Sequence, residues 1–242
     1  MSTYDVILPA GGTIPPEFAA VVGTPSKALV EIGGQCVLER TLHALADSGV
    51  VGRTVVIGGS NVLEHPAAAL ATYRIEQGAT GPENIFRGLD ALSSDGRAPE
   101  RVMIVTTDLP FLTGAVIRQF VESCSSDRDI CVPLISQKAF DGRYPGTHAT
   151  FVTLRDDTWT TGCAYVIDAK ALNSARRHIE RVFENRKSKF GMAKLLGPGF
   201  VYKWLTKQLT VADVERKVEA LLGCSAQAVR DSDPALCFDI DY

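Results

Sequence analysis

The sequence DVILPAGGTIPPEFAAVVGTPSKALV, residues 5–30, decides the fold and the place of the candidate site. An apolar run leads into a loop with the glycine pair Gly11 and Gly12, and the loop ends at a Pro-Ser-Lys sequence whose last residue is Lys27. Glycines at the carboxyl end of a strand present bare backbone N–H groups to an anion. A lysine shortly afterwards adds a point charge. The stretch is typical of a phosphate-binding loop, although it lacks the Gly-Lys-Ser/Thr of the P-loop.

The 242-residue chain has an ordinary globular composition, with 45% hydrophobic and 22% charged residues. Its net charge of −3 lacks the basic bias of nucleic-acid-binding proteins, and no apolar run approaches the roughly 20 residues of a membrane span. The N-terminus has no basic region followed by a long apolar run, so we expect no signal peptide. The six cysteines show neither Cys-x-x-Cys nor Cys/His zinc spacing, which predicts buried, reduced thiols in a cytoplasmic protein.

The first half of the chain alternates apolar strands with amphipathic helices. Strands are predicted at residues 4–9, 53–57, 73–77, 101–106 and 130–135. Helices are predicted at residues 37–48, 83–92 and 114–124, the last capped by Thr113. This alternation predicts an α/β fold with a mostly parallel central sheet and helices on both faces.

The second half follows a mixed pattern, and we expect the mixed part of the sheet there. A polar loop is predicted at 138–146, strands at 149–154, 162–167, 226–230 and 236–240, and a helix at 168–179. Thr210 and Asp213 resemble a capping box that opens a helix ending at Gly223. Because repeats and linkers are absent from the sequence, it predicts a single domain over residues 1–242.

Three features follow predicted strands at their carboxyl ends, where open α/β sheets bind ligands. They are the glycine loop at 10–12, the segment 81–84 at the start of a helix, and Asp108. An aspartate in this position can hold a divalent cation. Each feature alone has an ordinary explanation, such as a turn, a cap or a solvated surface lysine at position 27, but together they favour a ligand site.

Two charged segments each have two interpretations, one functional and one as ordinary solvent-exposed charge. Asp239 and Asp241 lie two positions apart, so on a strand they point the same way, toward a cation or toward water. The main positive cluster is either a solvated face or a grip for an acceptor phosphate or leaving pyrophosphate. It comprises Arg181, Arg186, Lys187 and Lys189.

These pieces, in this order, resemble the MobA-like nucleotidyltransferases, which include molybdenum-cofactor guanylyl- and cytidylyltransferases and methylerythritol-phosphate cytidylyltransferases. The family's strand into Leu-Ala-Gly-Gly and its Pro-x-Lys correspond to residues 8–12 and 25–27. Its glycine before a helix ending in Gly-Leu corresponds to residues 81–89. Its Asp-x-Pro corresponds to 108–110 and its closing acidic motif to 239–242. The resemblance extends over the whole chain.

The resemblance implies a GT-A-like, Rossmann-type fold that uses Mg²⁺ and a nucleoside triphosphate, with CTP or GTP favoured. A small phosphorylated or hydroxylated acceptor would receive the nucleotide, and pyrophosphate would leave. Such a protein could also form a homodimer. Lys27 and Asp108 would be catalytic, with Mg²⁺ on Asp108 and on Asp239 or, failing that, Asp241. The implied nucleotide-binding residues are Pro9, Ala10, Gly11, Gly12, Gly81, Asn84 and Thr107. The implied acceptor or phosphate residues are Arg186, Lys187 and Lys189.

The sequence departs from the family pattern at two places. The family loop carries an arginine soon after the glycine pair, whereas residues 13–18 read TIPPEF, with Glu17 and no basic residue before Lys27. The closing motif also lacks its Pro-Glu-Asp. The alternatives are therefore an active transferase, a nucleotide sensor without catalysis, and a GT-A glycosyltransferase. The glycosyltransferase is less favoured, because such an enzyme would bind a metal ion through an Asp-x-Asp pair after the central strand. Here a single acid, Asp108, follows the predicted central strand.

Overall fold

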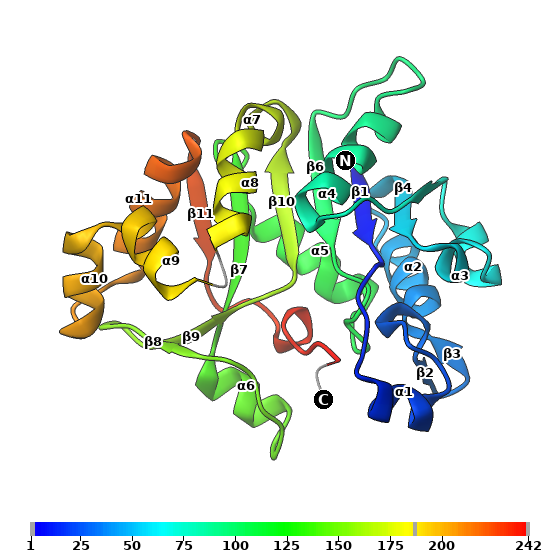
Figure 1. Ribbon diagram of the computed structural model, residues 1–242, viewed down its shortest axis with the longest axis horizontal. Helices are drawn as coiled ribbons and strands as arrows, with labels where there is room; N and C mark the ends of the chain where they lie inside the picture. Colours follow the sequence, from blue (N-terminus) through cyan, green and yellow to red (C-terminus); the bar gives the residue numbers. More distant parts are fainter. Residues whose placement is uncertain (1–2, 186–187, 241–242) are drawn as a thin grey trace.

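The computed structural model describes residues 3–185 and 188–240, with Lys189 described by its backbone alone. Within these residues the chain folds around a nine-stranded mixed sheet (Figure 1). Eight strands follow one another across it: β5 (Tyr73–Glu76), β4 (Val51–Gly58), β1 (Tyr4–Pro9), β6 (Arg101–Val105), β10 (Ala164–Asp168), β7 (Ile130–Ser136), β9 (Thr158–Thr161) and β8 (Val152–Thr153). The ninth, β11 (Ala226–Val229), pairs with β7.

Strand β1 lies between β4 and β6 and runs parallel to both. Its residues Val6, Ile7 and Leu8 are completely buried, as expected for a parallel strand covered on both faces. Strand β10 runs antiparallel between β6 and β7, and Ala164 at its start pairs with Val105 at the end of β6. The carboxyl ends of β1 and β6 and the start of β10 therefore lie at one edge of the sheet.

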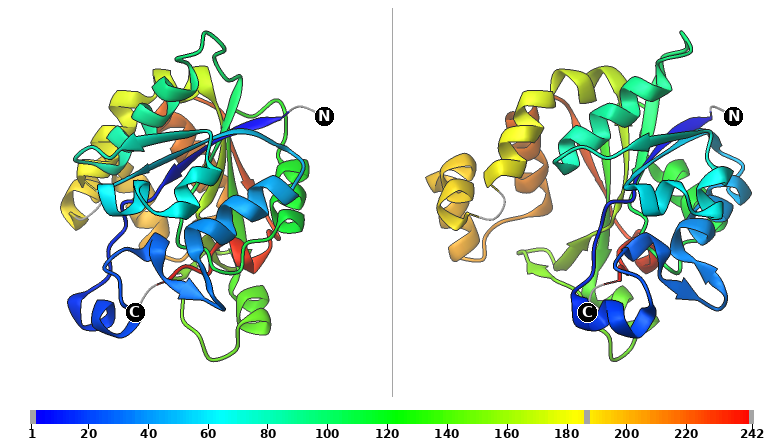
Figure 2. Two further views of the ribbon diagram at one scale, coloured as in Figure 1. Left: turned by 90° about the vertical axis from the view of Figure 1, so that its right-hand side faces the viewer. Right: turned by 45° about the vertical axis from the view of Figure 1, so that its right-hand side comes forward.

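Helices cover both faces of the sheet (Figure 2). On one face, α2 (Val37–Asp47) and α5 (Gly114–Ser123) share a core with Val6 and Leu8 of β1. On the other, α4 (Gly81–Leu92) and α7 (Ala169–Ser174) share a core with Ile7. Alternate residues of one strand thus enter opposite layers. The predicted fold class, an α/β fold with a mixed central sheet and helices on both faces, is confirmed.

The remaining elements extend this framework. Helices α8 (Arg176–Asn185) and α11 (Val211–Leu222) pack beside the second layer, while α9 (Lys189–Leu196) and α10 (Pro198–Leu205) project beyond them at one end of the molecule (Figure 1). The smaller elements are α1 (Pro16–Val22), η1 (Lys27–Leu29), β2 (Glu31–Ile32), β3 (Gln35–Cys36), α3 (Ser60–Leu63), η2 (Pro66–Leu70), α6 (Gln137–Arg143), α9 (Lys189–Leu196), α10 (Pro198–Leu205) and η3 (Pro234–Leu236).

Four predictions for the second half are wrong. The predicted polar loop at 138–146 is mostly helix α6, because Ser136 caps it through a hydrogen bond from the Ala139 N–H. The predicted helix at 168–179 is two helices, α7 and α8, which meet at Ala175. The predicted strand at 149–154 shrinks to β8, and it pairs with β9, which the sequence analysis missed.

The fourth error concerns the C-terminal segment. Of residues 236–240, a predicted strand, Leu236 ends the short helix η3, which Asp233 caps and Pro234 starts, and residues 237–240 form no regular element. The period-two argument for Asp239 and Asp241 therefore fails, and Asp241 lies outside the described residues. The capping box of Thr210 and Asp213 is present as predicted.

Two further predictions concern the whole chain. No described helix is long and apolar enough to cross a membrane. The single domain over residues 1–242 stays a prediction.

The fit of α4 onto β1 is testable through Gly88, an interior residue of α4. A Cβ at this position would lie 2.7 Å from Ile7 Cγ2 and 3.1 Å from Ile57 Cδ1, which is too close. We expect Gly88→Ala to lower the free energy of unfolding by about 1–3 kcal/mol, measured by urea denaturation.

Gly142 in helix α6 is the matched control, because a Cβ there meets nothing within 4 Å. Gly142→Ala should stabilise the protein by about 0.5–1 kcal/mol, since alanine is the better helix former. Equal effects of the two substitutions would contradict the close packing of α4 on β1.

Candidate functional site

A central cavity of about 700 Å³ opens at the carboxyl edge of the sheet. It lies where β1, β5 and β6 end and where α4 begins. It is lined by Pro9, Gly11, Gly12, Lys27, Gln77, Gly78, Ala79, Thr80, Gly81, Asn84, Thr106, Thr107, Asp108 and Phe183. Eight residues selected from the sequence are among them: Pro9, Gly11, Gly12, Lys27, Gly81, Asn84, Thr107 and Asp108.

The glycine loop folds back onto the segment that carries Lys27. The Lys27 N–H donates to the Gly12 carbonyl over 3.0 Å, and Thr13 forms a bridge with Ser26. A Cβ on Gly12 would lie 3.4 Å from Lys27 Cδ, so the lysine stem packs directly on the bare glycine backbone. Ala10 lines a smaller cavity next to the central one, together with both glycines of the loop.

The amino end of α4 forms another wall of the cavity. Thr80 caps the helix by accepting a hydrogen bond from the Glu83 N–H, and Gly81 is its first residue. The side-chain oxygen of Asn84 accepts a hydrogen bond from the Gly78 N–H over 2.6 Å, which holds the preceding loop in place. A helix amino terminus favours negative charge, so this wall suits an anionic or electron-rich ligand.

Lys27 and Asp108 form an ion pair inside the central cavity. Lys27 Nζ lies 3.5 Å from Asp108 Oδ2, and the two side chains are only 14% and 18% exposed. The other carboxylate oxygen, Oδ1, is buried and has no hydrogen-bond partner among the described residues. A buried carboxylate oxygen without a donor is costly unless a cation or a donor joins it.

The C-terminal segment lies directly against Asp108. The Ile240 N–H donates to the Asp108 carbonyl over 3.0 Å. Burial, with the negative charges of Asp108 and Asp239, raises the pKa of the Cys163 thiol to about 12. The hydrogen bond from Ile240 brings its neighbour Asp239 beside Asp108, although the segment is no strand.

These residues fit a magnesium ion that is shared with a substrate. Among the described residues no group of three or more His, Cys, Asp or Glu side chains could hold a metal alone. Mg²⁺ is usually bound by one or two carboxylates together with substrate phosphates and water. Asp108 and Asp239 could supply such a pair, because the Oδ1 of Asp108 has no hydrogen-bond partner among the described residues.

A second cavity of about 700 Å³, here called the aromatic cavity, adjoins this place. Asp239, Cys163 and the exposed His148 line it, and Phe238 stacks on its neighbour Phe140. Its full lining comprises Ile32, Pro110, Phe111, Phe140, Thr147, His148, Ala149, Thr150, Thr160, Thr161, Cys163, Cys237, Phe238, Asp239 and Ile240.

The basic cluster predicted from the sequence is described only in part. Arg181 is an exposed residue of α8, Arg186 and Lys187 lie outside the described residues, and Lys189 starts α9. Phe183, on the same helix as Arg181, lines the central cavity, so α8 ends beside it. A phosphate-binding role for the cluster stays a prediction.

The loop that lacks the family arginine, residues 13–18, starts at the site and then leaves it. Thr13 lines the adjoining small cavity, and Pro16 begins the short helix α1. Glu17 is exposed on that helix and lines neither the central nor the adjoining small cavity. Among the described lining residues of the central cavity, Lys27 is the one with a positive charge.

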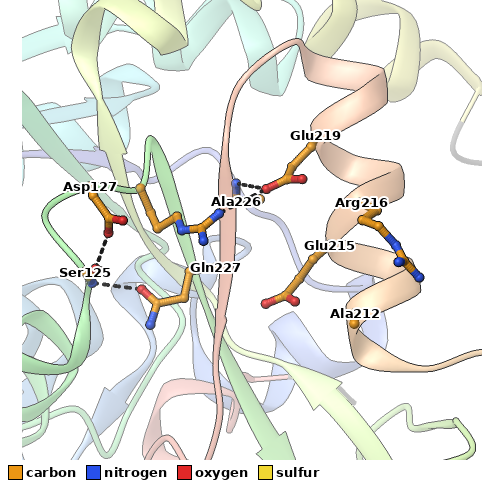
Figure 3. A pocket seen from close by; sticks show the side chains of 9 residues that line it. Ser125, Asp127, Ala212, Glu215, Arg216, Glu219, Ala226 and Gln227 are labelled. Atoms are coloured by element: carbon orange, nitrogen blue, oxygen red, sulfur yellow. Dashed lines mark hydrogen bonds and ion pairs between the residues drawn. The ribbon is translucent and has the colours of Figure 1, made fainter.

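Another cavity, of about 430 Å³, lies far from these residues, between β11, α11 and the segment before β7 (Figure 3). Its charged groups serve the framework. Glu219 accepts a hydrogen bond from the Ala226 N–H and pairs with Arg128, and Glu215 accepts from the Ala228 N–H. These contacts fix β11 to α11.

Sequence reasoning missed three residues that shape the site. Gln77 follows β5, and the rule that placed Asp108 at a strand end applies to it equally. Phe183 and Cys163 come from distant parts of the chain. Neither carries a sequence signal, because only the packing of α8 and β10 brings them to this edge.

The comparisons with known proteins agree with this geometry. A family model described as a MobA-like NTP transferase domain matches residues 18–198, more than half of the chain. The chain belongs to the MobA-like NTP transferase family. The resemblance drawn from the sequence is therefore confirmed, and the protein is a member of a nucleotidyltransferase family. The match begins after the glycine loop, whose place at the end of β1 comes from the structure.

Solved structures of this family's fold resemble the MobA-like chain over its whole length. A hypothetical transferase from Thermus thermophilus has a TM-score of 0.87 and 26% identity, covering 100% of this chain and 98% of its own. A nucleotidyl transferase from Methanothermobacter thermautotrophicus has 0.60 and 15%, covering 100% and 93%. The 2-C-methyl-D-erythritol 4-phosphate cytidylyltransferase of Thermus thermophilus has 0.56 and 17%, covering 100% and 94%. No curated protein gives a significant match.

The alignment of β1 with β6 at the site is testable through Thr107. Its hydroxyl donates to the Pro9 carbonyl over 3.1 Å, and the residue is buried. Thr107→Val keeps the shape but removes the hydroxyl that donates to this partly buried carbonyl, so we expect a loss of about 0.5–1.5 kcal/mol in the free energy of unfolding.

The control is Thr107→Ser, which keeps the hydroxyl and should retain most of that stability. Urea denaturation of both variants decides the matter. If the valine variant proves as stable as the wild type, the hydrogen bond does not join the two strand ends.

Proposed function

We propose that this protein transfers a nucleoside monophosphate from a nucleoside triphosphate to a small acceptor, with Mg²⁺, and releases pyrophosphate. The observation that supports this most strongly is the pairing of Lys27 with Asp108, whose second oxygen is buried and lacks a donor, inside a cavity with a glycine loop and a helix amino terminus. CTP and GTP are the favoured substrates. We expect the protein to act in the cytoplasm as a single domain and without a nucleic-acid partner.

Binding of the triphosphate would use backbone groups first. The loop of Gly11 and Gly12 gives close access to phosphate oxygens, and Lys27 would neutralise charge at the α-phosphate. Gly81 and Asn84 face the base in this arrangement, and a Cβ on Gly81 would lie only 3.1 Å from Phe183. Pro9, Ala10 and Thr107 hold the strand ends that carry these groups.

In the reaction an oxygen of the acceptor attacks the α-phosphorus in line with the leaving pyrophosphate. A new P–O bond forms as the bond to pyrophosphate breaks, and any proton of an acceptor hydroxyl passes to solvent. Asp108 and Asp239 would hold Mg²⁺, which neutralises phosphate charge when bound. The protein's task is to position the reactants and to balance charge, without a strong general base.

The ion pair determines how charge is balanced when a ligand binds. With no ligand present, Lys27 neutralises Asp108. A lone Mg²⁺ would have to join Asp108 beside a second cation, at a Coulombic cost. A Mg²⁺–triphosphate complex lowers that cost, because the phosphates provide Lys27 with a new anionic partner.

A nucleotide sensor without catalysis is the second candidate. It is favoured by one observation: among the described lining residues of the central cavity only Lys27 is positively charged, where the family loop adds an arginine. A glycosyltransferase gains no support, because the segment 106–108 after β6 contains a single carboxylate, that of Asp108.

Substitution of Asp108 tests the transferase. We expect Asp108→Asn to lower pyrophosphate release by about 10²–10³-fold, because it removes a charged ligand of the proposed Mg²⁺, which would neutralise the reacting phosphates. The measurement is a coupled pyrophosphate assay over a panel of nucleoside triphosphates and acceptors. Asp90→Asn, whose side chain is 73% exposed on α4, is the matched control and should keep wild-type rates.

A thermal-shift titration on the same samples separates the two candidates. A nucleotide-dependent rise in melting temperature without any turnover supports the sensor. Turnover at ordinary enzymatic rates removes it, and neither binding nor turnover with any triphosphate would sink both.

This balance of charge at the ion pair predicts that Lys27→Met changes the affinities for two ligands in opposite directions. Affinity for Mg²⁺ alone should rise, because the competing cation is gone. Affinity for the Mg²⁺–triphosphate complex should fall by about 10–100-fold, as expected for the loss of a hydrogen bond to a charged group. Isothermal titration calorimetry measures both; a parallel loss of both affinities would contradict the exchange of partners.

A further inference from the structure

An apolar groove of about 780 Å³ runs beside the aromatic cavity. No charged side chain occurs among the described residues that line it. They are Leu134, Thr150, Val152, Leu154, Trp159, Thr160, Thr161, Met192, Ala193, Leu196, Phe200, Val201, Trp204, Leu209 and Val214. A pocket this large and this apolar on a protein surface marks a binding site more often than a neutral surface.

The groove has a firm floor and an open rim. Leu134, Leu154 and Trp159 belong to a buried cluster that forms the floor. Helices α9 and α10 form the wall on one side, where the two helices project from the sheet (Figure 1). Trp204 on the rim is 53% exposed and Val152 is 46% exposed, so large apolar side chains there remain open to a ligand.

The groove is continuous with the aromatic cavity. Thr150, Thr160 and Thr161 line both. Asp239 and Ile240 line the aromatic cavity in turn, and the Ile240 N–H donates to the carbonyl of Asp108, which lines the central cavity. One path therefore leads from the proposed reaction centre, past three threonines, to a groove with no charged side chain among its described lining residues.

We propose that this groove binds the hydrocarbon chain of the acceptor, so that the acceptor is an amphiphile. Its phosphate or hydroxyl head would lie in the aromatic cavity near Asp239, where attack on the nucleotide occurs, and its apolar tail would lie between β9 and α10. The position of the head group rests on the proposed function, whereas the position of the tail rests on the apolar lining of the groove.

Chain length provides a quantitative signature. Each methylene group that moves from water into an apolar site strengthens binding by roughly fourfold. Affinity should therefore rise steeply with chain length until the groove is full and then level off. A polar acceptor without a tail would show no such series.

The chain contains a built-in reporter of occupancy. It has two tryptophans, Trp159 and Trp204, and both line the groove. We would titrate the protein with butyl, hexyl and octyl phosphate, and in a second arm with the matching 1,2-alkanediols, all below micelle formation. Saturable changes in tryptophan fluorescence that strengthen with chain length support the proposal, and the better arm identifies the head group. Inorganic phosphate, the tail-free control, should leave the fluorescence unchanged.

Paired variants localise the tail. Ala193→Glu places a charge in the groove and should weaken octyl-chain binding by at least tenfold. Leu205→Glu on α10 is the matched control, because Leu205 is 69% exposed and does not line the groove. It should bind like the wild type. Circular dichroism checks that both variants fold.

Binding that does not depend on chain length, or an Ala193→Glu variant that binds as the wild type does, would overturn the proposal. So would a dimer in sedimentation experiments that Ala193→Glu dissociates while alkyl chains fail to bind, since a second copy would then occupy the groove. Nucleotide-dependent thermal shifts are measured separately. If alkyl chains bind and nucleotides do not, the groove binds hydrocarbon but the proposed transferase function is wrong. If nucleotides bind and alkyl chains do not, only the proposed role of the groove is wrong.

Discussion

Burial of β1 on both faces is the constraint on which the rest of the structure depends. Val6 and Leu8 enter one layer and Ile7 the other, and parallel neighbours on each side satisfy the backbone. A strand held in this way cannot shift its register without exposing apolar side chains. The glycine loop that follows it is therefore presented at a fixed point, and the Thr107 hydroxyl ties the end of β6 to the same point through Pro9.

The site uses that rigidity to hold opposite charges close together. Lys27 reaches Asp108 because its stem lies on the bare backbone of Gly12, and the C-terminal segment joins Asp108 through the Ile240 N–H. Three distant parts of the chain thus converge at Asp108: Lys27 contacts its carboxylate, and Ile240 bonds its backbone carbonyl. Charges that are mostly removed from water interact more strongly than surface charges, so a ligand can rearrange this small set with large effect.

The parts of the site that lie directly after strands could be predicted from the sequence, because strand ends and glycine loops are local signals. Asp108 and the glycine loop are examples. Asp239 was selected through family resemblance and a strand that does not exist, and Phe183 was not selected at all. Their places depend on how η3 and α8 pack, which short-range periodicity does not encode. Helix α6 was missed because a polar, exposed helix has little apolar period.

The reversed direction of β10 has a consequence for how such a protein can diversify. A parallel strand brings its end to the ligand edge, whereas β10 brings its beginning, so Cys163 and the threonines of β9 arrive there from the opposite direction of the chain. The two sides of the site are thereby built from separate stretches of sequence. Mutations in the β8–β9 hairpin and in α9 and α10 can remodel one side while the glycine loop, Lys27 and Asp108 remain untouched.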